Sequence, residues 1–332
     1  MKKILSLIIG LFLSATFFVS CKKEAKQNGL SNQFIYRTTE PLIVGQSIDF
    51  AYGMGSTNGP LNTAQVIASI PGATGTLFET VTHRTVNAAD MTTVVATSST
   101  TSGATSKATL IDTNATTLRY SYIIPEEARG QEVSFNFSVT NKAGDEASTT
   151  TPGYKVSKMD MARNITLEGT ASGARYFSIA DMKAYTQAEV DAGNISSKID
   201  FIYAYAPTIT PTTTAYTYGH SLVSPAASGY FPAGFTIPSG WTKNSTLMEK
   251  KIGNTLYDGQ LKGDPNISIY VDDLDLQKQS FDGSANYAIT LANDGSVFMK
   301  TADGKYTAFI YVNKVTNASN TAVISLKRLQ NF

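Results

Sequence analysis

Apolar residues alternate strictly with polar ones in several short stretches between residues 34 and 155, and a period of two restricts these stretches to β-strands. The clearest set consists of Val133, Phe135, Phe137 and Val139. Two further sets follow the same period: Ile48, Phe50 and Tyr52, and then Leu118, Tyr120 and Tyr122. Such strands bury one face and leave the other in water. Turn signals separate them, so residues 34–156 are predicted to form an antiparallel β-sandwich with no helix.

The stretch from Thr92 to Thr109 is composed almost entirely of Ser, Thr, Ala and Gly. Such a composition buries little apolar area. Two structures fit it, a long mobile loop and a weak hairpin at the edge of a sheet, and composition alone does not choose between them.

A second domain is expected because about 300 residues exceed what a single core normally holds. Thr151-Pro152-Gly153 marks the boundary, and residues 157–332 form the second unit. Its pattern is mixed, which predicts a β-rich α+β domain with an antiparallel sheet. The chain as a whole is therefore expected to be mainly β.

Local signals divide the second domain into strands and helices. Thr186-Gln187-Ala188-Glu189 has the form of a capping box, with Gly193 as the stop of the helix. A second helix is predicted over residues 247–261. The predicted strands are the following: 199–205, 267–271, 297–301, 309–312 and 323–329.

The N-terminus has the order of a secretory signal, with Met1-Lys2-Lys3 before an apolar run from Ile4 to Val19. Spanning a bilayer takes about 20 apolar residues, so this run favours a removed signal peptide over residues 1–20. The alternative is a retained N-terminal helix. Residues 22–33 are polar and lack periodicity, which predicts a flexible tether that reaches about 40 Å when extended.

Cys21, the only cysteine, stands directly after this signal. The segment Phe18-Val19-Ser20-Cys21 resembles the signals of bacterial lipoproteins, in the loose form common among Bacteroidetes. The resemblance implies that Cys21 carries the lipid and that residues 21–33 form a lipidated tether at the outer membrane. Lys22-Lys23-Glu24-Ala25-Lys26 matches the surface-export pattern only in part, so the surface-exposed and the periplasmic face both stay open.

Charge and cysteine content exclude several classes of function. The full chain has 27 basic and 26 acidic residues and a net charge of +1. The first 33 residues hold five of the lysines and one of the glutamates, so the body from residue 34 on has 22 basic and 25 acidic residues and a net charge of −3. A slightly acidic body offers no electrostatic footprint for nucleic acid. With Cys21 lipidated, the mature body lacks the thiols that disulfides, iron–sulfur clusters and cysteine-bound zinc require.

Two further resemblances concern the body of the chain. Leu42 to Phe50 and Ser134 to Ala147 resemble strands of the immunoglobulin-like domains of bacterial surface proteins, which implies a spacer or docking module for residues 34–156. Phe298 to Tyr306 is similar to a recurring ending of Bacteroidetes surface lipoproteins. That second resemblance implies no activity.

The segment from Pro207 to Asn244 is rich in aromatic residues amid Pro, Thr, Gly and Ser, and Lys243 is its only charged residue. Long loops without secondary structure tend to be functional or disordered. Aromatic rings can lie flat on the apolar faces of sugars, and the candidate ligand-binding residues are Tyr216, Tyr218, Tyr230 and Trp241. The alternative is that these rings, with Phe231, fill the gap between the two domains.

Catalytic and metal-binding patterns are weak. His220 beside Ser221 lacks a G-x-S-x-G elbow, and His83 is the only other imidazole. Asp272, Asp273 and Asp275 lack the spacing and the glycine of a calcium loop, although calcium there stays open. No catalytic residue, metal site or cofactor is therefore assigned.

These observations predict a lipid-anchored, non-catalytic surface protein, with a membrane contact through its N-terminal lipid and a glycan or a surface protein as partner. Its expected role is an accessory module of an outer-membrane nutrient-uptake system. The alternative is a fimbrillin-like structural subunit or adhesin anchor, which assembles by inserting a strand into a neighbour. An unpaired terminal segment would support assembly, and residues 323–329 are the C-terminal candidate.

Overall fold

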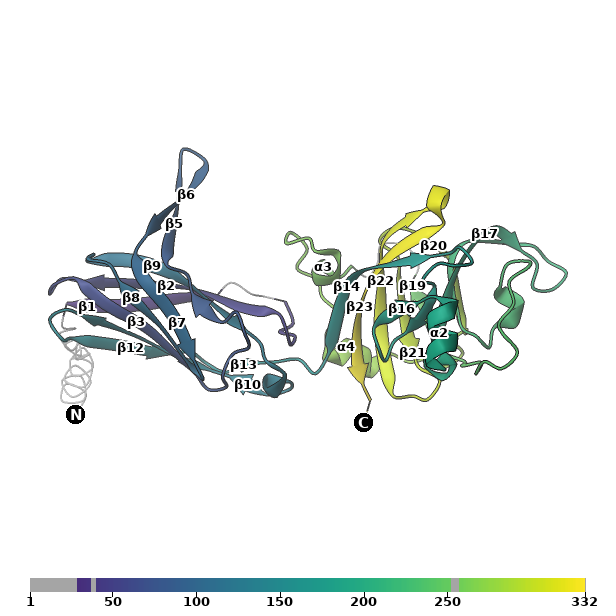
Figure 1. Cartoon of the computed structure of the whole chain (residues 1–332), viewed down its shortest axis with the longest axis horizontal. Helices are drawn as coiled ribbons and strands as arrows, with labels where there is room; N and C mark the ends of the chain where they lie inside the picture. Colours follow the sequence, from purple (N-terminus) through teal and green to yellow (C-terminus); the bar gives the residue numbers. More distant parts are fainter. Residues whose placement is uncertain (1–28, 37–39, 252–256, 332) are drawn as a thin grey trace, which may run out of the picture.

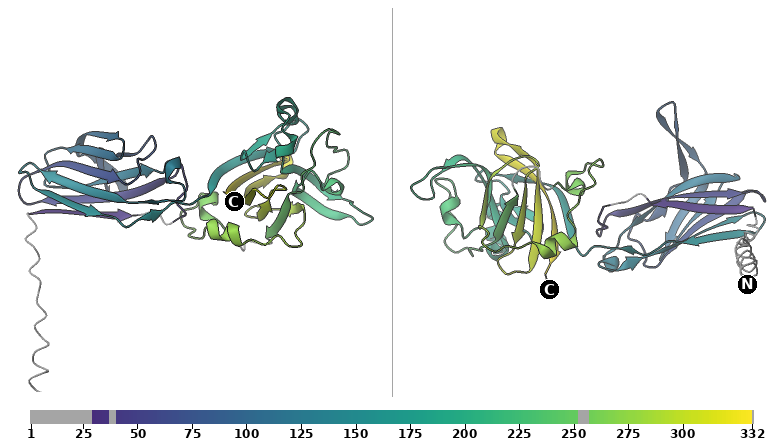
Figure 2. Two further views of the ribbon diagram at one scale, coloured as in Figure 1. Left: turned by 90° about the horizontal axis from the view of Figure 1, so that it is seen from below. Right: turned by 180° about the vertical axis from the view of Figure 1, so that it is seen from behind.

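The computed structural model describes residues 29–36, 40–251 and 257–331, so Cys21 and the predicted signal and tether up to residue 28 lie outside it. The predicted tether boundary at residue 33 is wrong, because strand β1 (Leu30–Tyr36) of the first domain already begins at Leu30 and pairs with β2 (Ser47–Ser56). The chain is mainly β, as predicted, and forms two β-sandwich domains placed end to end (Figure 1). The start of the described chain lies at the end of the first domain that is farthest from the second (Figures 1 and 2). No helix among the described residues is long and apolar enough to cross a bilayer.

The first domain packs two antiparallel sheets face to face. One sheet has the order β1-β2-β9-β4, with bounds Leu30–Tyr36, Ser47–Ser56, Ala115–Ile123 and Leu77–Phe78. The other has the order β12-β11-β3-β8-β7, with bounds Glu146–Thr150, Phe135–Asn141, Leu61–Ala68, Thr105–Leu110 and Ala96–Ser102. Two small ribbons complete the domain: β5 (Val81–Val86) with β6 (Ala89–Val94), and β10 (Glu132–Val133) with β13 (Tyr154–Lys155).

Aromatic rings dominate the core of the first domain, and the predicted alternation is confirmed. The alternating residues of the three predicted stretches are buried between the sheets, while most of their neighbours point outward. Phe137 lies at the centre, with its ring centroid 5.0–5.9 Å from those of Phe34, Phe50, Tyr52 and Tyr120. Such contacts add to the large apolar area that each ring buries.

The Ser/Thr-rich stretch forms the edge hairpin that was one of its two predicted structures. Strands β7 and β8 pair along their length and stand at the end of the sheet. Side chains of β7 are mostly exposed, which is how a polar edge strand stays soluble and resists pairing with other chains. The helical turn η1 (Glu126–Ala128) in this domain was not predicted.

The second domain is also a sandwich of two antiparallel sheets. One has the order β14-β23-β22-β21-β19, with bounds Asp160–Glu168, Thr321–Gln330, Tyr306–Thr316, Ser296–Lys300 and Leu247–Lys251. The other has the order β16-β15-β17-β18-β20, with bounds Lys183–Tyr185, Tyr176–Ser178, Phe201–Ile209, Tyr216–Val223 and Tyr287–Leu291. The described helices are α2 (Gln187–Gly193), α3 (Gly259–Lys262) and α4 (Asp273–Lys278), with short turns η2 (Ser196–Lys198), η3 (Ser228–Tyr230) and η4 (Asn317–Ser319).

Insertions cover the outer faces of both sheets of this second sandwich. The segment with α3 and α4 packs on the outer face of the first sheet, where Phe309, Tyr311 and Leu329 are buried against Leu261 and Leu276. The loop of residues 224–246 and helix α2 pack on the outer face of the other sheet. The capping box of α2 is confirmed, since the Thr186 hydroxyl accepts from the Glu189 N–H and the Glu189 carboxylate accepts from the Thr186 N–H.

Three predictions for the second domain are wrong. Residues 247–251 form strand β19, not the start of a helix, and only α3 is helical in the described part of 247–261. Residues 267–271 belong to no strand: the N–H of Val271 donates to the Asp258 carboxylate, and the carbonyl of Ile269 accepts from the Gly259 N–H, both at 2.9 Å. The segment 323–329 is not a free end, since β23 is paired on one side with β14 and on the other with β22.

The junction between the domains is held by backbone and side-chain contacts. Val156 forms a parallel bridge with Leu42, and the N–H of Ser157 donates to the carbonyl of Leu42 at 2.7 Å. Ile43 of the first domain is buried in the cluster under α3 and α4 of the second domain.

A chain of charges reinforces the junction. The guanidinium of Arg129 binds Asp160 at 2.7 Å, and Asp160 also binds Arg328 at 2.8 Å. Arg129 donates as well to the carbonyls of Lys158 and Met159, both at 3.1 Å. These contacts link the turn before β10 to the first and last strands of the second domain.

Candidate functional site

Three tyrosines gather on the outer face of the second domain, where strands β18 and β20 meet the covering loop. Tyr216 opens β18 and is 44% exposed. Tyr230, in turn η3, stacks on Tyr287 of β20 with ring centroids 3.5 Å apart and an interplanar angle of 17°. We call Tyr216, Tyr230 and Tyr287 the tyrosine cluster.

The hydroxyls of the tyrosine cluster are close enough to affect one another. A hydrogen bond with Tyr230 is the main cause that raises the pKa of Tyr287 to about 12, and burial and the nearby Tyr216 add to it. The Tyr287 hydroxyl is therefore neutral at physiological pH. A neutral phenol both donates and accepts a hydrogen bond, which suits recognition of a hydroxyl-rich ligand.

Tyr216 lies near the end of the molecule farthest from the first domain, whereas Tyr287 pairs with Val223 at the opposite end of β18. Strands β17 and β18 form a hairpin whose turn is the distal tip in every view (Figures 1 and 2). Tyr216 stands directly after that turn and pairs with Ile209. Any ligand bound there would be held away from the first domain.

Two residues of the tyrosine cluster, Tyr216 and Tyr230, were predicted from the sequence. The other two predicted residues, Tyr218 and Trp241, are not part of the cluster. Tyr218 is fully buried in the cluster with Ala204 and Val223, so it offers no surface to a ligand. Trp241 lies apart, with its ring edge-on to Tyr176 at 5.0 Å and its indole N–H donating to Asp191 of α2 at 2.7 Å. Tyr287 was missed, although Tyr287, Ile289 and Leu291 keep the period of a strand.

The aromatic segment does not fill the gap between the domains. Phe231, Phe235 and Trp241 pack with Tyr176 and Ile202 on the outer face of the second domain's own sheet. The guanidinium of Arg175 lies 4.6 Å from the centroid of the Phe235 ring, a cation–π contact that holds the loop down. Because each ring has its own covering partner, most of this segment is structural.

His220 is a buried hydrogen-bonding residue between the sheets. Its Nε2 is 2.7 Å from Oδ1 of Asn317, and its Nδ1 is 2.6 Å from the hydroxyl of Tyr203. The neighbouring Ser221 hydroxyl donates to the carbonyl of Tyr218 at 2.9 Å. A hydrolytic triad needs a serine and a carboxylate on this imidazole, and both ring nitrogens are bound to other groups. His83 lies in the first domain, in contact with Glu79.

The acidic residues near α4 are committed to structure. The Asp272 side chain caps α4, accepting from the N–H groups of Leu274 and Asp275 at 2.8 and 3.1 Å. Asp273 accepts from the Lys158 N–H at 2.9 Å and from the Ser157 hydroxyl, which ties α4 to the linker. Among the described residues, no group of three or more His, Cys, Asp or Glu is arranged to hold a metal ion.

A cavity of about 870 Å³ lies at the junction of the domains. Tyr270 and the exposed side chains of Ile269 and Leu274 line it, together with Asp272 and Asp273. Both carboxylates already hold α4 and the linker, so they are not available to a ligand, and no aromatic stack lines the cavity among the described residues. The tyrosine cluster is therefore the better candidate site.

Comparison with known proteins divides the chain at the same place as its structure. The model described as "Domain of unknown function (DUF4466)" matches residues 27–156, and that described as "Domain of unknown function (DUF8576)" matches residues 157–331. A solved structure of a DUF4466 family protein from Parabacteroides merdae is 36% identical, with 92% of this chain and 99% of that chain covered and a TM-score of 0.81.

Other solved structures are much less similar. The major pilin subunit of Bacillus cereus is 12% identical over 57% of this chain and 63% of that chain, with a TM-score of 0.28. A family 123 glycoside hydrolase from Clostridium perfringens is 12% identical over 39% of this chain and 27% of that chain, with a TM-score of 0.26. No protein with a curated description matches the sequence.

Proposed function

We propose, for a chain that belongs to the DUF4466 family, that the protein is a lipid-anchored, non-catalytic cell-surface protein whose distal tip binds carbohydrate. It would serve as an accessory module of a nutrient-uptake system in the outer membrane. The observation that carries the proposal is the tyrosine cluster on the outer face of the second domain.

The chemistry of the tyrosine cluster suits a sugar. The exposed ring of Tyr216 can pack on the apolar C–H face of a pyranose, and the neighbouring phenols can exchange hydrogen bonds with its hydroxyls. Stacking of Tyr230 on Tyr287 fixes both rings before a ligand arrives. Such preorganisation lowers the entropic cost of binding.

The geometry of the body suits a protein anchored at its N-terminus. Leu30, the first residue of β1, lies at the end of the first domain opposite the second domain (Figure 1). A lipid on Cys21 would therefore leave the tyrosine cluster pointing away from the membrane. Acyl chains hold a protein by burying CH₂ groups, and stable anchoring takes more than one chain.

Binding is tested on a glycan array with the mature chain, residues 21–332, carrying Cys21→Ser to keep it soluble. We expect Tyr216→Ala to weaken binding at least tenfold and Tyr287→Phe to weaken it less, because the second change removes only a hydroxyl. Thr217→Ala, at the next position of β18, is the matched control and should bind as the unmodified chain does. Failure of the chain to bind any glycan would shift weight to the structural alternative.

Anchoring needs its own experiment, because it does not depend on the ligand. Cells expressing the whole chain are fed an alkyne-tagged fatty acid, and incorporation is compared with that of Cys21→Ser. We expect labelling only with Cys21 present. Protease added to intact cells then separates the two faces of the outer membrane, since only a surface-exposed body is degraded.

A further inference from the structure

A groove crosses the outer face of the first domain, on the sheet that contains β1, β2, β9 and β4. Two adjoining cavities of about 400 and 610 Å³ make it up. Its floor consists of cross-strand pairs of β2 and β9, which are Asp49 with Ser121, Ala51 with Arg119, Gly53 with Thr117 and Gly55 with Ala115. Four consecutive outward positions of a strand span about 20 Å, at about 3.3 Å a residue.

Small residues of β2 line the middle of the groove, and longer side chains flank them. Ala51, Gly53 and Gly55 lie in the middle of the sheet, between longer side chains of β1 and β9. The ribbon of β5 and β6 stands up from the sheet beside the floor (Figure 1), and its Thr82 and Arg84 line the cavity. Exposed Ile35 and Leu77 lie on opposite sides of the floor, so apolar edges flank a polar centre.

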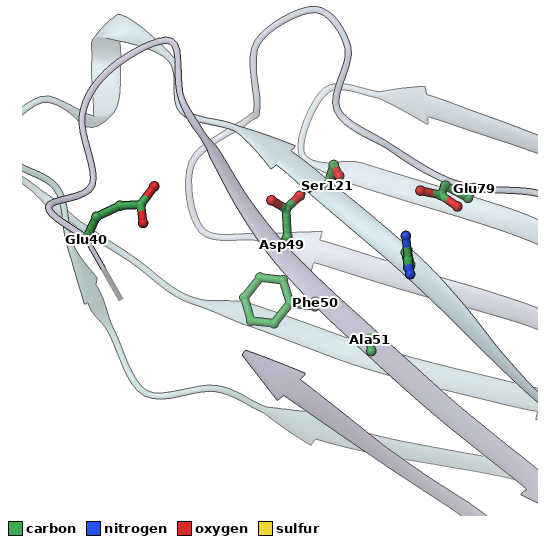
Figure 3. Close-up of a pocket in the computed structure, with 7 residues that line it drawn as sticks. Glu40, Asp49, Phe50, Ala51, Glu79 and Ser121 are labelled. Atoms are coloured by element: carbon green, nitrogen blue, oxygen red, sulfur yellow. Dashed lines mark hydrogen bonds between the residues drawn. The ribbon is translucent and has the colours of Figure 1, made fainter. Parts of the chain in front are cut away.

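Charged groups converge at one end of the groove, as Figure 3 shows for Glu40, Asp49 and Glu79. Asp49 is held in place because its carboxylate accepts from the Ser47 and Ser121 hydroxyls at 2.7 and 2.6 Å. The N–H of Glu79 donates to the carbonyl of Arg119 at 2.9 Å, which brings the two residues onto neighbouring segments of the sheet.

This lining selects among ligands. Carboxylates accept hydrogen bonds and a guanidinium donates several, a combination that binds adjacent sugar hydroxyls. Hydroxyls of Ser31, Thr82 and Thr117 continue the polar surface along the groove. Three carboxylates against one guanidinium at the charged end disfavour acidic sugars by repulsion. Extended shape, polar floor and apolar edges together fit an oligosaccharide that carries no acid group.

We propose that the groove over Asp49, Ala51, Gly53 and Gly55 is a second saccharide site, which binds an extended, non-acidic oligosaccharide of several units. It is separate from the tyrosine cluster, lies on the domain nearer the membrane, and would hold a chain that the distal tip has captured. The proposal goes beyond the distal site and stands on different residues.

Gly53→Val is the sharpest test, because it fills the floor without disturbing the fold. The three atoms nearest to a Cβ at Gly53 would belong to the Gln33 and Thr117 side chains, at ordinary contact distances of 3.4–3.7 Å, and the φ of Gly53 is not positive. A β-branched residue also suits a strand. Ser148→Val, on the exposed side of β12 in the other sheet, is the matched control.

Affinities are measured by calorimetry on the mature chain with neutral glucan, mannan and xylan oligomers of two to six units, and with an oligogalacturonate. We expect affinity to rise with length, Gly53→Val to abolish the gain from added units, and Asp49→Asn to lower affinity at least tenfold, while Ser148→Val changes nothing. The oligogalacturonate should bind at least tenfold more weakly than the neutral oligomers.

The outcomes separate the two sites. Length-dependent binding that survives Tyr216→Ala but not Gly53→Val supports the groove even if the distal tip proves inert. Unchanged binding in both Gly53→Val and Asp49→Asn, or no binding of any oligomer at millimolar concentration, overturns the groove proposal. Circular dichroism of each variant confirms that a lost signal is not lost fold.

Discussion

The two domains are both β-sandwiches, but they treat the outer faces of their sheets in opposite ways. In the first domain the outer face of β1, β2, β9 and β4 is open and polar, and its stability comes from one aromatic core. In the second domain, insertions cover both outer faces and create additional apolar clusters. An open sheet face leaves room for a groove, whereas a covered one leaves only the edges of its cover for contact.

This contrast implies that the stability of the first domain depends on a single core, so that one substitution there should have a large effect. Phe137→Ala would remove the central ring of its aromatic core and is expected to cost about 3–5 kcal/mol of unfolding free energy. Urea denaturation, followed by tyrosine fluorescence, should show an early transition of the first domain. An unshifted first transition would mean that the aromatic core is not what holds this sandwich together.

In the second domain a buried ion pair connects the segment with α3 and α4 to the sheet beneath it. Lys327 and Asp258 are both fully buried, with Nζ and Oδ2 2.7 Å apart, and burial lowers the pKa of Lys327. Lys327→Met should cost about 3 kcal/mol, because the Asp258 carboxylate would remain buried without its cation. The double variant Lys327→Met/Asp258→Asn should recover part of the loss. In Lys327→Met, amide hydrogen exchange should increase more in α3 and α4 than in β22. Equal increases in all three elements would mean that the ion pair does not specifically stabilise the α3–α4 segment.

A smaller, pH-dependent effect is expected at Asp200, where the sandwich of the second domain meets its covering loop. Burial raises the pKa of Asp200 to about 7, although its carboxylate accepts from the Ile179 N–H at 2.7 Å and the Thr246 hydroxyl at 3.2 Å. Between about pH 4 and 7 the folded state keeps a proton that the unfolded chain releases, so stability falls as pH rises through this window and is level above it.

The change at Asp200 should be on the order of 2 kcal/mol between pH 5 and pH 8. Melting temperatures at the two values measure it. Asp200→Asn should flatten the difference, whereas Asp282→Asn, at an exposed carboxylate, should leave it intact. A pH dependence that persists in Asp200→Asn would assign it to another group.

Sequence patterns predicted the first domain better than the second for a physical reason. Val133 to Val139 alternates because one face is buried and the other is wet, and this is the signal that a sequence shows most clearly. Residues 267–271 alternate too, yet their hydrogen-bond partners include the Asp258 side chain and the Gly259 backbone instead of a neighbouring strand. Those partners lie outside the strand pattern and cannot be read from local spacing.

The candidate site was predicted only in part. Tyr216 and Tyr230 were found through their unusual surroundings, but Tyr218 was grouped with them although its side chain is buried. Gly219, with φ of +58°, and a bulge between His220 and Leu222 shift the register of β18, so the aromatic residues there follow no simple period. Tyr287 reaches Tyr230 through tertiary packing, which no stretch of sequence displays.

The charge chain of Arg129, Asp160 and Arg328 at the junction has a consequence for avidity. If these contacts hold the joint in one arrangement, the proposed tip and groove stay at one separation. A polymer bound at one site then meets the other at an effective concentration set by geometry, not by diffusion. Short oligomers that cannot reach both sites would gain no affinity from the second site, so the protein would select saccharides above a minimum length.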